Sequence, residues 1–90
     1  MIQLYGIDGC KWCQKAQVLL ETAGKPFQYT HVEYVNKHAF MDGFQTVFPD
    51  STRTFPRVTK TETNPEKFEP VVKLIGGFDE LLEELLHERI

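Results

Sequence analysis

The only two cysteines of the chain, Cys10 and Cys13, lie three positions apart in the stretch GCKWCQKAQVLL (residues 9–20). Thiolates at this spacing can bind a metal ion, form a structural disulfide or exchange electrons through a reversible disulfide. The choice among these three chemistries depends on which other ligands the chain offers and on the local structure around the pair.

The sequence offers little for a zinc site or for a purely structural disulfide. Structural zinc takes about four protein ligands, so histidines would have to complete the site. His31 and His38 are not at the usual His-x₃₋₅-His spacing, and His87 is the only other histidine. A disulfide that closes a loop of only a few residues constrains the unfolded chain little. The local pattern therefore favours redox chemistry.

Cys10 comes directly before an apolar periodicity that predicts a helix over residues 11–23. The unpaired N–H groups and the positive dipole end at a helix N-terminus stabilise a thiolate. Lys11 adds a neighbouring positive charge, and both effects lower the pKa of a cysteine. Cys13, one turn further along, is expected to be more buried. We therefore predict that Cys10 attacks disulfides and that Cys13 resolves the mixed disulfide.

Hydrophobic periodicity and turn residues predict the elements that hold this helix. Asn36 is a plausible N-cap for a second helix, and a polar hairpin region is expected over residues 60–70. The predicted strands cover residues 2–5, 26–35, 54–59 and 71–75, and a final helix begins at Phe78.

The predicted order of elements is β-α-β-α-β-β-α. A strand, a helix and a second strand within about 30 residues imply a parallel pair joined by a right-handed crossover. The last two strands are close enough for an antiparallel hairpin. We therefore expect an α/β fold in which a mixed four-stranded sheet carries three helices, as one domain over residues 1–90.

Composition excludes some classes of function. The chain has 90 residues, of which 41% are hydrophobic and 26% charged, and its formal net charge of −3 gives no basic footprint for nucleic acid. No apolar run approaches the length of a membrane span. The N-terminal MIQLYGIDG does not read as a signal peptide, because it lacks a basic region followed by an apolar one. We expect a cytoplasmic protein.

Two further stretches are compatible with a substrate site beside the cysteines. Pro56 in RTFPRV (residues 53–58) is compatible with a cis peptide bond, which would turn the free backbone of the preceding residue toward the cysteines. IGGFDEL (residues 75–81) places two glycines and then a carboxylate at a helix N-terminus. Each stretch also has a plain structural explanation, namely an ordinary trans proline and a turn with a capped helix.

Together the three stretches resemble the glutaredoxin family of the thioredoxin-fold superfamily, in order and over nearly the whole chain. The CKWC stretch matches the active-site C-x-x-C, RTFPRV matches R-T-V-P-x-V with its cis-proline at Pro56, and IGGFDEL matches I-G-G-x-D-x-L. Lys11 and Trp12 replace the common Pro and Tyr, and Asp8 is an acid where many members carry a base. The long segment between the last two strands resembles small virus-encoded members.

The resemblance implies a dithiol glutaredoxin, which reduces protein disulfides and glutathione mixed disulfides, with glutathione as co-substrate and with no tightly bound cofactor and no metal. The backbone of Phe55 would pair with the glutathione cysteine, Asp79 would meet the γ-glutamyl group and Arg53 the glycyl carboxylate. The predicted glutathione-binding residues are Arg53, Thr54, Phe55, Pro56, Gly77, Phe78 and Asp79, and the predicted flanking residues are Tyr5, Lys11 and Trp12.

The implied partners are glutathione and disulfide-containing proteins, of which ribonucleotide reductase is a common client in the family, and the implied state is a monomer. Two other functions remain open. One is a glutaredoxin-like protein reduced by thioredoxin reductase, although Asp79 favours glutathione. The other is a carrier of an iron–sulfur cluster ligated by Cys10 and glutathione, against which the bulky Trp12 and the complete cysteine pair argue.

Overall fold

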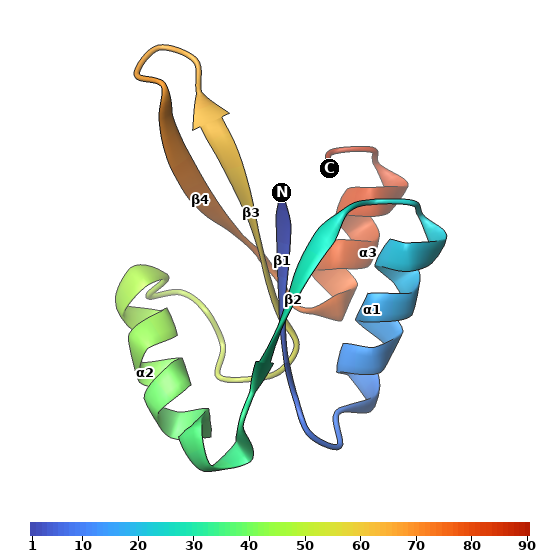
Figure 1. The fold of residues 1–90 in the computed structure, drawn as a ribbon, viewed down its shortest axis with the longest axis vertical. Coiled ribbons are helices and arrows are strands. Elements are labelled where there is room, and N and C mark those ends of the chain that lie inside the picture. Colours follow the sequence, from blue (N-terminus) through green and yellow to red (C-terminus); the bar gives the residue numbers. More distant parts are fainter.

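The computed structural model describes residues 1–90 and contains one four-stranded sheet with the strand order β2-β1-β3-β4 (Figure 1). The β1–β2 pair is parallel, and the β1–β3 and β3–β4 pairs are antiparallel, so the predicted mixed α/β sheet with three helices is confirmed. The elements are β1 (Ile2–Ile7), α1 (Lys11–Thr22), β2 (Phe27–Val32), the 3₁₀ helix η1 (Tyr34–Asn36), α2 (Lys37–Val47), β3 (Arg57–Asn64), β4 (Glu69–Gly76) and α3 (Phe78–Leu86).

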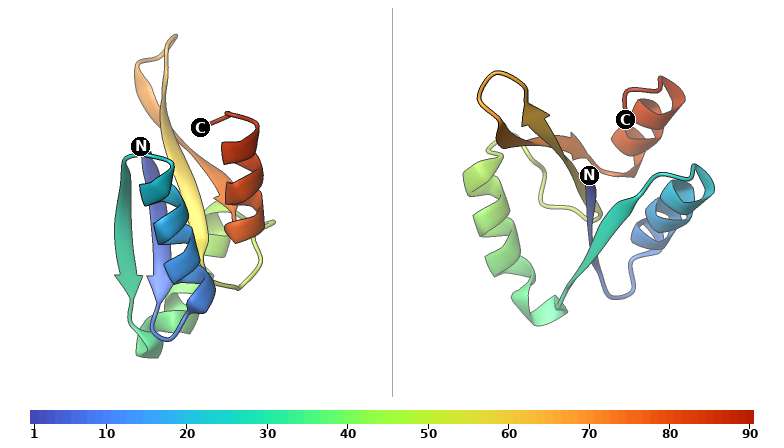
Figure 2. Two further views of the ribbon diagram at one scale, coloured as in Figure 1. Left: turned by 90° about the vertical axis from the view of Figure 1, so that its right-hand side faces the viewer. Right: turned by 45° about the horizontal axis from the view of Figure 1, so that its top comes forward.

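Helices cover both faces of the sheet, with α1 and α3 on one face and α2 on the other (Figures 1 and 2). Side chains alternate between the faces of a strand, and β1 follows this rule, since Ile2 and Leu4 are buried whereas Gln3 and Tyr5 are only partly buried. The main core joins β1, β3 and β4 to α1 and α3, and it consists of Ile2, Leu4, Ala16, Leu20, Val58, Ile75 and Leu81.

An aromatic cluster fills the space between the sheet and α2. The ring of Tyr5, from the other face of β1, lies 5.4 Å from the ring of Phe40 and 6.0 Å from that of Phe44. The ring of Phe40 also stacks on the ring of Phe55, which lies in the loop before β3, with 5.7 Å between the ring centroids. This cluster fixes α2 and the loop to each other.

The last two strands are longer than the sequence predicted. The polar hairpin region expected over residues 60–70 is mostly strand, because β3 runs to Asn64 and β4 starts at Glu69. The two strands pair up to Asn64 and Glu69, and one charge pair links them, since Glu62 of β3 accepts a hydrogen bond from Lys73 of β4 at 3.0 Å. The bond from Lys73, and a second one from Lys60 of the same strand at 3.2 Å, lower the pKa of Glu62. The hairpin extends past the rest of the sheet (Figure 1).

Two other strand boundaries differ from the prediction. The third strand begins at Arg57, after the proline rather than before it, and the second strand ends at Val32 before the 3₁₀ helix. Proline has no N–H to donate to a ladder, which accounts for the later start of β3. No helix of the fold has the length and apolar character needed to cross a membrane.

Strand pairing brings three distant segments together at one end of the sheet. Tyr5 in β1 pairs with Arg57 at the start of β3, so the loop that leaves β1 and the loop that enters β3 lie side by side. Val58 pairs with Gly76, the last residue of β4, so the turn into α3 joins them. The cysteine stretch, the RTFPRV stretch and the IGGFDEL stretch therefore converge.

We expect Leu20→Ala to lower the free energy of unfolding by about 2–5 kcal/mol, because Leu20 is fully buried between α1 and the sheet. Leu86→Ala is the matched control, since Leu86 is 72% exposed near the end of α3 and its loss should change stability by less than about 0.5 kcal/mol. Urea unfolding of the two variants measures the difference. Equal losses would contradict the described core.

Candidate active site

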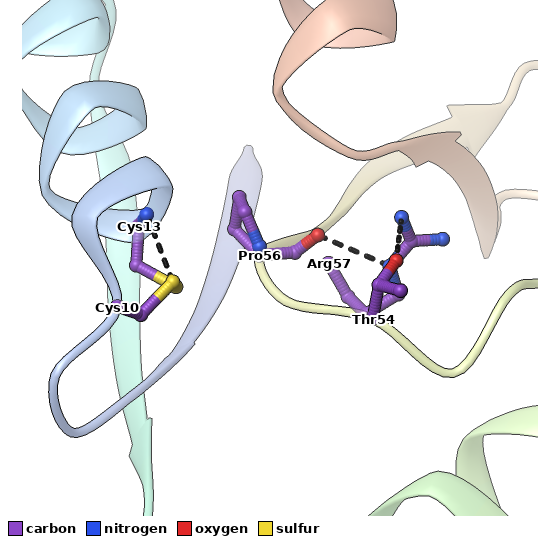
Figure 3. Close-up of a disulfide and its surroundings, with 5 residues drawn as sticks. All are labelled: Cys10, Cys13, Thr54, Pro56 and Arg57. Carbon is purple, nitrogen blue, oxygen red and sulfur yellow. Dashed lines mark hydrogen bonds between the residues drawn. A yellow bond between two sulfur atoms is a disulfide. The ribbon is translucent and has the colours of Figure 1, made fainter.

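Cys10 lies at the junction between the loop after β1 and helix α1. It is the N-cap residue of α1, in extended conformation, and its Sγ accepts a hydrogen bond from the N–H of Cys13 at 3.1 Å. The two cysteines are joined in a disulfide with their Cα atoms 5.2 Å apart (Figure 3). Cys13 is 2% exposed whereas Cys10 is partly exposed, so only Cys10 is open to a substrate.

The surroundings of Cys10 favour negative charge on sulfur. The first turn of α1 holds no acidic residue, and Lys11 and Lys15 supply positive charge on the same helix. Asp8, the acid that precedes Cys10, is turned toward a base, because its Oδ1 lies 3.1 Å from Nε2 of His31. The helix terminus and the lysines therefore act on Cys10 with little local opposition.

Trp12, between the two cysteines, borders the site. Its indole is half exposed and packs on the ring of Phe78 at 5.2 Å, and the Nζ of Lys15 lies 4.3 Å from the indole centroid. The Trp12–Phe78 pair links the first turn of α1 to the first residue of α3. A single aromatic wall thereby joins two of the three converging segments.

The loop before β3 presents an unpaired backbone opposite the cysteines. The Phe55–Pro56 peptide bond is cis, as predicted for Pro56, and Figure 3 shows Pro56 across from the Cys10–Cys13 disulfide. Neither the N–H nor the C=O of Phe55 has a hydrogen-bond partner in the chain. Because one extended peptide can pair with another through such groups, Phe55 offers a short edge for a peptide ligand.

Arg57 is a site residue that sequence reasoning missed. It is 5% exposed and donates to three neutral oxygens. These are the carbonyl of Pro56 at 3.1 Å and the hydroxyl of Thr54 at 3.4 Å, both drawn in Figure 3, and the hydroxyl of Ser51 at 3.0 Å. Burial lowers the pKa of Arg57, while the negative charge of Glu80 acts in the opposite direction. Arginine side chains are mostly exposed, so the sequence did not indicate that Arg57 would be buried.

The start of α3 is shaped around Arg57. Gly77 is the N-cap, and a Cβ there would lie 2.9 Å from Nη2 of Arg57, so a larger residue would require the guanidinium to shift. The Oε1 of Glu80 accepts a hydrogen bond from the backbone N–H of Gly77 at 2.8 Å and so caps the helix. Asp79 is exposed and its carboxylate has no hydrogen-bond or salt-bridge partner. Capping is therefore not the role of Asp79.

Two cavities lie on either side of the Phe55 backbone. The first, of about 390 Å³, is here called the Gly77 cavity. It is lined by Trp12, Thr52, Thr54, Phe55, Pro56, Arg57, Gly77, Phe78, Asp79 and Glu80. The second, of about 360 Å³, is called the Cys10 cavity. It is lined by Ile7, Asp8, Gly9, Cys10, Tyr34, Lys37, Arg53, Thr54 and Phe55.

Arg53, one of the predicted residues, lines the Cys10 cavity rather than the Gly77 cavity. Its Nη1 donates to Asp42 at 2.9 Å and to Gln45 at 2.8 Å, so α2 already holds the guanidinium. Lys37, at the first position of α2, was not predicted. Its Nζ lies 5.3 Å from the ring centroid of Tyr34 and forms no salt bridge, which leaves an unpaired cation beside Cys10.

The other predicted residues divide into two groups. Trp12, Thr54, Phe55, Pro56, Gly77, Phe78 and Asp79 all line the Gly77 cavity. Tyr5 and Lys11 line neither cavity, since Tyr5 packs under α2 and Lys11 borders a separate groove formed by α1 and Phe78 of α3.

A separate cluster of possible metal ligands lies outside the cysteine pair. Exposed Asp8, His31 and Glu33 offer ligand atoms within 4.8 Å of one another. Neither cysteine belongs to this cluster, and His31 is its only histidine.

Comparison with known proteins identifies the fold. The crystal structure of glutaredoxin 1 from Francisella tularensis in complex with cacodylate aligns over 98% of this chain and 94% of that chain, with a TM-score of 0.70 and 23% sequence identity. No family model and no curated protein matches the sequence. At this identity the likeness shows the architecture, and we conclude that the chain has the thioredoxin-like fold of a glutaredoxin.

Proposed function

We propose that the chain is a dithiol glutaredoxin, a glutathione-dependent thiol–disulfide oxidoreductase. The observation that carries this proposal is the unpaired Phe55 backbone between two cavities, directly across from a cysteine pair at a helix N-terminus. A short peptide that bears a thiol can pair with this backbone through its central residue and reach into both cavities with its two ends. Glutathione has this form.

The reaction follows from the positions of the two thiols. The Cys10 thiolate attacks a sulfur of the substrate disulfide, the new S–S bond forms as the old one breaks, and the leaving thiolate takes a proton from solvent. Cys13 then loses its proton and attacks the Cys10 sulfur, which releases the second substrate thiol and forms the Cys10–Cys13 disulfide. Two glutathione molecules return the two electrons and leave as glutathione disulfide.

The charges around the two cavities support one orientation of glutathione. Lys37 and Arg53 border the Cys10 cavity, where they would bind the glycyl carboxylate. Many members of the family carry a basic residue shortly before the first cysteine, where this chain has Asp8. In this role Lys37 of α2 would supply that positive charge instead. The γ-glutamyl end would enter the Gly77 cavity, where Asp79 has a free carboxylate for its ammonium group.

We expect turnover of a glutathione mixed disulfide when the chain is supplied with glutathione, glutathione reductase and NADPH, because the unpaired Asp79 carboxylate suits the glutathione ammonium. NADPH consumption measures the rate. The same mixture with thioredoxin reductase in place of glutathione and its reductase should give little consumption. Efficient turnover with thioredoxin reductase and none with glutathione would contradict the proposal.

We expect iodoacetamide to modify Cys10 first in the reduced protein, because Cys13 is buried and Cys10 caps α1. Mass spectrometry of the tryptic peptide identifies the modified sulfur, and the rate against pH should have its midpoint well below about 8.5, the value of a free thiol. Cys10→Ser is the control and should react slowly. First modification of Cys13, or a midpoint above about 8, would reverse the assigned roles.

Cys13→Ser should keep activity on glutathione mixed disulfides and lose most activity on protein disulfides. The first reaction needs one attacking thiolate, whereas the second needs a thiol that resolves the mixed disulfide. Parallel assays with a glutathionylated peptide and with a disulfide-bonded protein measure the two rates. Equal losses in both assays would show that Cys13 has no separate resolving role.

A further inference from the structure

The guanidinium of Arg57 is a buried cation without an anionic partner. Arg57 is 5% exposed and forms no salt bridge, and the groups that accept its hydrogen bonds are a carbonyl and two hydroxyls. Removing a charge from water is costly unless an opposite charge compensates for it. The acid with the largest effect on it, Glu80, uses one carboxylate oxygen to cap α3. Charge compensation for Arg57 is therefore incomplete in the protein alone.

Arg57 lines the Gly77 cavity, which is large enough for a ligand to supply the missing charge. The absence of a side chain on Gly77 brings the guanidinium close to the start of α3, whose first N–H groups also favour an anion. The free carboxylate of Asp79 lines the same cavity. The cavity thus offers one region for a carboxylate and a separate group for an ammonium ion.

We propose that Arg57 binds the α-carboxylate of a free α-amino-acid group while Asp79 binds its ammonium, so that Arg57 selects for the γ-glutamyl end of glutathione. This inference rests on the proposed function. It adds a specificity-determining residue that contributes binding energy through a charge-assisted hydrogen bond. The competing explanation is that Arg57 only holds the loop, because its three hydrogen bonds all go to residues 51–56.

Two glutathione analogues separate these explanations without altering the protein. In 4-aminobutyryl-cysteinyl-glycine the α-carboxylate is absent and the ammonium is kept, and in glutaryl-cysteinyl-glycine the reverse holds. Each is linked by a disulfide to the same reporter peptide, and transfer to Cys10 is measured as kcat/KM. Loss of one charge-assisted hydrogen bond corresponds to a fall of about 10- to 150-fold, which we expect for both analogues with the unaltered chain.

Two variants complete the test as a double-mutant cycle. Arg57→Gln should lower kcat/KM for the glutathione substrate by a similar factor and leave the 4-aminobutyryl substrate nearly unchanged, and Arg57→Lys should restore part of the loss. Asp79→Asn is the matched control, since it should affect the substrates that carry an ammonium and spare the glutaryl substrate. Thermal unfolding of each variant shows whether the fold is retained.

The outcomes distinguish this inference from the proposed function. If the unaltered chain uses glutathione and the 4-aminobutyryl analogue equally well, or if Arg57→Gln slows all three substrates by the same factor, Arg57 only holds the loop and the inference is wrong while the function stands. If the unaltered chain uses none of the three substrates, the proposed function fails and the inference fails with it.

Discussion

The antiparallel pairing of β1 with β3 is the constraint on which the site depends. The pair Tyr5–Arg57 fixes the ends of two loops, one leading to Cys10 and the other coming from Pro56, and the pair Val58–Gly76 adds the start of α3. These are backbone hydrogen bonds within a sheet whose two faces are both packed by helices. Segments more than 40 residues apart in the chain therefore meet without relying on the conformation of any single loop.

Both signs of charge border the site. Lys37, Arg53 and Arg57 line the two cavities beside Phe55, together with the acids Asp8, Asp79 and Glu80. The three cations differ in how their charge is paired. The guanidinium of Arg53 is already held by α2, Lys37 is unpaired, and Arg57 is buried with neutral partners. An anion that enters either cavity therefore meets at least one cation, although the chain as a whole is acidic.

Features encoded locally could be predicted from the sequence, and features that depend on tertiary packing could not. The helix after Cys10 follows from a pattern within a few residues, the mixed sheet follows from the order and spacing of the elements, and the cis bond before Pro56 was predicted from the resemblance of the RTFPRV stretch to a family segment. The guanidinium of Arg57 is buried close to Gly77, which is twenty positions away, and the position of Lys37 depends on how α2 packs. The length of the β3–β4 hairpin was misjudged because its polar residues pair across the two strands, as Glu62 of β3 does with Lys73 of β4.

The most direct test of this account is the structure of the Cys13→Ser protein with glutathione trapped as a mixed disulfide on Cys10. The account predicts that the glutathione cysteine pairs with the backbone of Phe55, that its glycyl carboxylate lies near Lys37 and Arg53, and that its γ-glutamyl group lies in the Gly77 cavity. A tripeptide bound in the opposite direction, or one that contacts neither cavity, would contradict it.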